Sequence, residues 1–122
     1  MGLGPSNEDL ERLAADLVRR RRQIEADELA WSIDAAVLVA NDYHLRDGST
    51  TGVDWLRHSC KMGRGQAADR LCVGEQIGRL VGTTEAMAEG HVGFGHLVLM
   101  ARTSEVVKQG FDEGRLLQKA RE

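Results

Sequence analysis

Residues 6–41 decide the fold of this chain, and they read SNEDLERLAADLVRRRRQIEADELAWSIDAAVLVAN. No glycine or proline interrupts the chain between Ser6 and Gly48, and a large apolar side chain returns every seven residues, at Leu10, Leu17, Ile24, Trp31 and Leu38. This spacing, preceded by a capping serine and acidic residues, predicts one long helix over residues 7–43. Its length would be on the order of 50 Å. We therefore expect it either to bend or to extend beyond the rest of the chain and meet a partner helix.

The apolar repeat of this helix is interrupted by charge. The positions that would complete the heptad hold Arg20, Arg21, Asp27 and Glu28, where a two-stranded coiled coil needs apolar residues. The pattern argues against a self-sufficient zipper and favours a long helix packed on a small bundle. Pairing of two copies through the long helix, to give a homodimer, stays open as an alternative.

The remaining sequence predicts a helical bundle over residues 50–122. The expected helices run from Thr50 or Thr51 to Cys60, from Gly65 to Leu80, from Gly82 to Glu89, from His91 to Arg102 and over residues 104–121. A loop over residues 42–50 precedes them, and Gly90 is expected to end one helix in the left-handed conformation. We predict an all-α fold of five to six helices in one domain, residues 1–122, with residues 1–6 as a flexible N-terminus.

Composition limits the class of protein. The 122 residues are 42% hydrophobic and 29% charged, with a net charge of −3, which is typical of a single small folded domain. The longest apolar run, residues 35–40, is too short to cross a membrane. The two cysteines are spaced neither as a disulfide framework nor as a zinc site, which favours reduced thiols and a cytoplasmic location. Strong non-specific nucleic-acid binders carry a much larger positive excess.

No residue pattern in the sequence predicts catalysis, a metal site or a cofactor. Cys60 and Cys72 have no further ligands at zinc spacing, and His91 and His96 lie five residues apart rather than four. Residues 63–68 match the G-x-G-x-x-A dinucleotide pattern, but that motif works only at a strand-to-helix turn, and a helix is expected before it here. We expect these glycines to shape a turn between helices.

The same turn outlines a helix-turn-helix, the arrangement that many DNA-binding domains use. Arg64, Gln66 and Arg70 would then lie at the start of the helix that reads bases, although Asp69 beside them would repel phosphates. An ordinary corner of a helical bundle accounts for the pattern equally well. Gly74, Gly78 and Gly82, four residues apart, are expected to let another helix approach closely.

Four consecutive arginines, residues 19–22, form the most conspicuous charge run. They surround the helix, so only some of them, represented by Arg20 and Arg21, can face one ligand such as double-stranded DNA. Asp16, Glu25 and Glu28 lie at pairing distance along the helix, which favours a solvated charged surface as the alternative.

Residues 49–102 resemble the 13E12 repeat family, whose N-terminal region is known as domain of unknown function 222. The resemblance lies in STTGVDWL at residues 49–56, AADRL at residues 67–71 and AMAEGHVGFGH at residues 86–96. In that family a helical region precedes an HNH endonuclease domain in bacterial proteins that resemble mobile elements. The nuclease motif itself has no counterpart in this sequence.

The resemblance implies a non-catalytic helical accessory module of an HNH-endonuclease-like protein that assists DNA binding through residues 51–80 and the arginine run. The alternative is a module for self-association or protein interaction without nucleic-acid contact. A third interpretation, a chain with no activity of its own, stays open.

Overall fold

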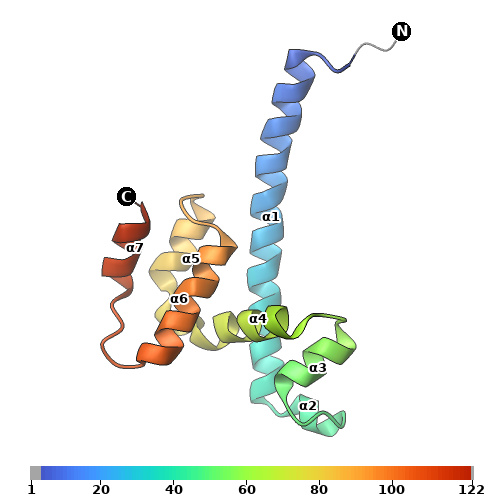
Figure 1. Ribbon diagram of the computed structural model, residues 1–122, viewed down its shortest axis with the longest axis vertical. Coiled ribbons are helices and arrows are strands. Elements are labelled where there is room, and N and C mark those ends of the chain that lie inside the picture. Colours follow the sequence, from blue (N-terminus) through green and yellow to red (C-terminus); the bar gives the residue numbers. More distant parts are fainter. Residues whose placement is uncertain (1–3, 122) are drawn as a thin grey trace.

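The computed structural model describes residues 4–121, and every regular secondary-structure element in that range is a helix, which confirms the predicted all-α class (Figure 1). The elements are α1 (Asn7–Ala40), α2 (Tyr43–Arg46), α3 (Gly52–Ser59), α4 (Arg64–Gln76), the 3₁₀ turn η1 (Ile77–Arg79), α5 (Val81–Ala88), α6 (Phe94–Val107) and α7 (Glu113–Arg121). A long N-terminal helix therefore packs on a small bundle, as predicted. The extra helix, α2, lies in the segment that we expected to be a loop.

Helix α1 begins at the predicted cap. The Ser6 side chain accepts a hydrogen bond from the Asp9 backbone N–H, and the Asp9 carboxylate accepts one from the Ser6 N–H in return. The helix ends at Ala40, three residues earlier than predicted, because Asp42 adopts a left-handed conformation with φ of 58°. Of the predicted flexible N-terminus, residues 1–3 lie outside the described residues.

Two clusters of buried side chains hold the bundle together. One joins α4, α5 and α6, and its fully buried members include Val73, Leu80 and Leu97. The other joins α1, α3 and α4 around Leu56 and Ala67. Helix α4 contributes to both, so it links the long helix to the rest of the bundle, and Figure 1 shows it crossing the C-terminal half of α1.

The crossing of α1 and α4 depends on Gly74. A Cβ at this position would collide with the Ser32 carbonyl oxygen of α1 and lie 2.7 Å from the Ala36 Cβ. The predicted role in close helix approach is therefore correct for Gly74. It is wrong for Gly78, where a Cβ would meet nothing within 4 Å.

The prediction of one helix over residues 104–121 is wrong. Helix α6 continues to Val107, and a loop with positive φ at Lys108 and Gly110 separates it from α7. Arg79 stabilises this end of α6, because its guanidinium donates hydrogen bonds to the carbonyls of Ser104 and Lys108. An arginine from η1 therefore binds one carbonyl in the last turn of α6 and the carbonyl of the residue that follows the helix.

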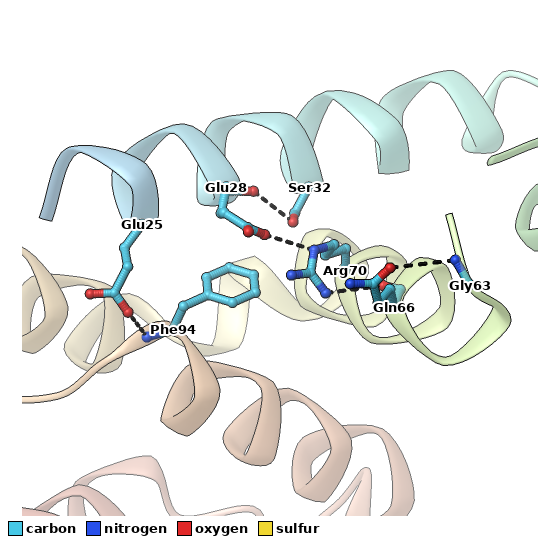
Figure 2. A network of polar contacts seen from close by, with 7 residues as sticks. All are labelled: Glu25, Glu28, Ser32, Gly63, Gln66, Arg70 and Phe94. Carbon is cyan, nitrogen blue, oxygen red and sulfur yellow. Dashed lines mark hydrogen bonds and ion pairs between the residues drawn. The ribbon is translucent and has the colours of Figure 1, made fainter. Parts of the chain in front are cut away.

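Two helices begin without a capping side chain of their own and are capped by distant glutamates. The Glu113 carboxylate of α7 accepts hydrogen bonds from the backbone N–H groups of Gly82 and Thr83, at 3.1 and 2.8 Å, and from the Thr83 hydroxyl, at 2.7 Å. At the start of α6, the Glu25 carboxylate of α1 accepts a hydrogen bond from the Phe94 N–H (Figure 2). These contacts fix both helices to the bundle through the orphan donors at their N-termini.

Candidate interaction surfaces

We call the N-terminal part of α1, residues 7–24, the α1 arm; its first half extends beyond the bundle and its second half lies at the edge of it (Figure 1). Its large apolar side chains are between 48% and 57% exposed: Leu10, Leu13, Leu17, Val18 and Ile24. Four of them, all except Val18, lie on one side of the helix, because they recur at intervals of three, four and seven residues. The arm therefore presents an apolar stripe that the described part of the chain leaves largely uncovered.

The bundle meets α1 only past the middle of the arm. A cleft of about 410 Å³ separates α1 from the turn between α3 and α4, and Ile24 and Trp31 of α1 line it together with Met62. A second cleft, of about 390 Å³, lies between Leu17 and Val18 of the arm and Met87 and Val92 of the bundle. The apolar stripe thus runs from free helix into grooves at the edge of the bundle.

The arginine run lies on the arm, where its members have different partners. Arg19 and Arg20 both form ion pairs with Asp16, one turn earlier in the same helix. The Arg22 guanidinium lies over Gly90. Within residues 4–121 no carboxylate lies within ion-pair distance of Arg21, which is exposed. Of the two arginines proposed from sequence, Arg21 is the one that is available to a ligand.

The corner between α3 and α4 has the predicted helix-turn-helix outline, and Arg64 and Gln66 lie exposed in the first turn of α4. The side-chain Oε1 of Gln66 accepts a hydrogen bond from the Gly63 N–H at 3.4 Å, so this side chain also caps its own helix (Figure 2). Arg64 donates to Asp54 at 3.4 Å. Both predicted contact residues are therefore exposed in the first turn of α4, each with a partner at the corner.

Arg70, the third predicted contact residue, points away from the corner toward α1 (Figure 2). Its Nε donates to the Glu28 carboxylate at 2.7 Å, and its guanidinium lies 5.3 Å from the centre of the Phe94 ring. Only 18% of the side chain is exposed. Asp69 is likewise occupied by Arg102, at 2.8 Å. Both residues hold α4 against neighbouring helices.

The corner carries less positive charge than its sequence suggests. A hydrogen bond from Thr51, followed by the nearby charge of Arg64, holds the pKa of Asp54 below its ordinary value. This carboxylate therefore stays ionised at neutral pH, where it also lies 3.6 Å from Arg57. Its charge offsets part of the field that two arginines would otherwise present to a phosphate.

The buried thiol does not offer a nucleophile. Burial, and then a hydrogen bond to Glu105, raises the pKa of Cys72 to about 12, so the thiolate that would react is almost absent at neutral pH. No group of three or more histidine, cysteine or acidic side chains in the described chain is placed to hold a metal ion.

The described helices include none with the length and apolar character needed to cross a membrane.

Comparisons of the chain with family models, with characterised proteins and with solved structures found no match. The resemblance to the 13E12 repeat family stays a prediction from sequence.

The sequence did contain the signal for the exposed stripe, in the heptad that starts at Leu10. It could not show that the bundle ends before that stripe does.

Proposed function

We propose that this chain is a non-catalytic accessory module whose main activity is self-association through the α1 arm. The observation that carries the proposal is the apolar stripe of Leu10, Leu13, Leu17 and Ile24, half exposed along a helix that leaves the bundle. Covering a half-exposed side chain of this size returns roughly 1 kcal/mol. The same stripe on a second copy is the complementary surface that a twofold interface requires.

Replacing Leu13 and Leu17 together by aspartate is expected to raise the dissociation constant of the self-associated form at least about a hundredfold, because charges would enter a desolvated seam at both copies. Both positions are solvent-exposed in the single chain, so the helical circular dichroism should not change. Sedimentation velocity over a micromolar concentration series measures the effect.

The control is the pair Leu99→Asp and Val106→Asp, two apolar positions on α6 that are more exposed than Leu13 and Leu17. This variant should associate like the wild-type protein. If it dissociates while the arm variant does not, association takes place through α6 and the proposal for the arm is wrong. A wild-type protein that sediments as a monomer throughout the series also contradicts the proposal.

DNA binding is the second candidate function. It is supported by the exposed pair Arg64 and Gln66 at the helix-turn-helix corner, and by the exposed Arg21 on the arm. The resemblance of residues 49–102 to the 13E12 repeat family supports the same role, as an accessory module of a protein with an HNH endonuclease domain. A cytoplasmic location remains part of this proposal. The internal ion pairs of Arg20, Arg70 and Asp54 weigh against a strong phosphate-binding surface.

Arg64→Ala and Arg70→Ala separate DNA contact from folding. Arg64→Ala should weaken binding to a DNA duplex and reduce its salt slope by about one, while the melting temperature stays unchanged, because an exposed ion pair contributes little. Arg70→Ala should instead lower the free energy of unfolding by about 2 kcal/mol, since it removes a half-buried ion pair and a cation–π contact. Gel-shift titrations at two salt concentrations and thermal melts test both.

Unchanged DNA affinity in Arg64→Ala would remove the corner from the proposal. Absence of any salt-dependent binding by the wild-type protein at micromolar concentration would rule out DNA binding as a whole and leave self-association as the function.

A further inference from the structure

We propose that the cleft between the α1 arm and the turn from α5 to α6 binds an acidic segment of a partner protein, one that carries an apolar side chain next to a carboxylate. We call it the arginine cleft. Its volume is about 390 Å³, and its lining includes Val18, Arg21 and Arg22 of the arm and Met87, Gly90 and Val92 of the bundle. The inference goes beyond the proposed self-association, because the cleft shares only Leu17 with the apolar stripe.

The arginine run, residues 19–22, divides into two pairs of different character. The first two arginines are both neutralised by Asp16 in their own helix. The other two, Arg21 and Arg22, are exposed, and no carboxylate among residues 4–121 lies within ion-pair distance of either. These are the two arginines that line the cleft. Two guanidinium groups are therefore available there to a carboxylate from outside the chain.

The glutamate that could neutralise this pair is engaged elsewhere. Glu25 follows Arg21 by four residues and Arg22 by three, which is the spacing of ion pairs along a helix. Its carboxylate instead accepts a hydrogen bond from the Phe94 N–H at the start of α6 (Figure 2). The Arg22 guanidinium packs over Gly90, where a Cβ would lie 2.6 Å from its Nη2. Tertiary contacts thus leave both arginines unpaired and hold one of them at the wall of the cleft.

The two arginines lie on either side of one line along α1. Val18 and Glu25 are seven residues apart, so they lie on the same side of the helix, and both line the cleft. Arg21 and Arg22 lie between them, three and four residues after Val18, and their side chains therefore diverge to the two sides of that line. A carboxylate placed one turn beyond Val18 has an arginine on each side.

An apolar floor continues from this pair of charges. Val18 is 57% exposed and does not belong to the apolar stripe, so self-association through the stripe leaves it uncovered. Met87 and Val92 lie across the cleft from it. An apolar side chain placed between these three would remove their surfaces from water. Methionine and arginine are also residue types that are enriched where proteins bind one another.

The shape and charge of the cleft favour a peptide segment over other anions. A pocket for a small molecule encloses most of its ligand, whereas Leu17 and Val18 are more than half exposed along this cleft. A DNA backbone would gain nothing from the apolar floor and would meet the negative charge of Glu25. Recognition of an acidic motif by a group of arginines is a known mode of peptide binding. An acidic segment with one apolar side chain uses both halves of the cleft.

Selection from a phage-displayed library of random peptides on the wild-type protein tests the inference. We expect the enriched peptides to combine aspartate or glutamate with a neighbouring large apolar residue. Synthetic copies are then titrated by fluorescence anisotropy. Arg21→Ala with Arg22→Ala should raise their dissociation constant at least about tenfold, because charge-assisted contacts are lost. Val18→Ser should raise it about threefold through the lost apolar contact. These positions are exposed, so the helical circular dichroism should not change.

Arg19→Ala with Arg20→Ala is the matched control. It removes the same charge from the same helix, but from the two arginines that Asp16 already neutralises. This variant should bind the selected peptides like the wild-type protein. Leu13→Ser is the second control, because Leu13 lies on the apolar stripe but does not line the cleft. It should weaken self-association and leave peptide binding unchanged.

Enrichment of basic or uncharged peptides overturns the inference, as does an equal loss of affinity in the two double arginine variants. If no acidic peptides are enriched and a DNA duplex loses affinity for Arg21→Ala with Arg22→Ala but not for Val18→Ser, the two arginines bind DNA and the inference is wrong. If no acidic peptides are enriched and Arg21→Ala with Arg22→Ala sediments as a monomer, the cleft holds a second copy of this chain. In that case self-association stands and the inference fails.

Discussion

Gly74→Ala is expected to lower the free energy of unfolding by about 2–3 kcal/mol. The added methyl group would collide with the carbonyl oxygen of Ser32 and approach the Ala36 Cβ to 2.7 Å. A backbone carbonyl inside a helix cannot rotate away as the end of a flexible side chain can, so α1 and α4 must separate. Since α4 takes part in both buried clusters, that separation loosens both. Urea denaturation followed by circular dichroism measures the loss.

Gly78→Ala provides the matched control for this prediction. It lies four residues further along the chain, and its added methyl group would meet nothing within 4 Å. We expect a change within about 0.5 kcal/mol, with a small gain possible because alanine restricts the unfolded chain more than glycine does. Equal losses in the two variants would show that helix propensity, rather than the contact with Ser32, explains the cost at Gly74.

The second large effect is expected from the glutamate that caps α5. Glu113→Ala should cost about 2–3 kcal/mol, because three hydrogen bonds to one carboxylate are lost and two backbone donors of a helix start are left without a partner. Glu113→Gln keeps an acceptor oxygen but removes the charge, so it should lose about half as much. The same denaturation measurement applies to both.

Glu25→Ala removes the corresponding cap of α6 and should add its own loss to that of Glu113→Ala, because the two carboxylates serve different helices. Glu85→Ala is the control, since Glu85 is exposed and its carboxylate accepts no hydrogen bond among the described residues. A loss below about 0.5 kcal/mol in Glu113→Ala would mean that water replaces this cap at no cost.

Local signals in the sequence predicted much of the fold. The Ser6 cap, the seven-residue apolar repeat and the left-handed Gly90 each depend on residues within a few positions, and each is confirmed. The same kind of signal placed the helix-turn-helix corner, where Thr51, one of the two threonines expected at the start of the helix, caps α3. Local signals failed over residues 104–121, where a continuous apolar pattern hid the loop that begins at Lys108.

The predicted DNA-contact residues show the same contrast between what local sequence signals can predict and what depends on distant residues. The sequence singled out Arg64, Gln66 and Arg70 together, because it could place all three on the first turns of one helix. It could not show that Arg70 faces Glu28, 42 residues earlier in the chain, whereas Arg64 remains exposed. Trp55 of α3 is likewise placed by a residue outside its own helix: it is half-buried, and its indole N–H donates to Asp47 at 2.8 Å.

A set of helices led by one long helix could be predicted from the sequence, since helix periodicity and capping are properties of neighbouring residues. Tertiary structure alone decided which glycine lies in the helix crossing, which glutamates cap α5 and α6, and how much of the apolar stripe on α1 stays uncovered. Each of these depends on groups far apart along the chain, as with Glu25 and Phe94, which are 69 residues apart. A pattern within one helix shows which face of that helix is apolar. Only the packed bundle shows how far along the helix the other helices cover that face.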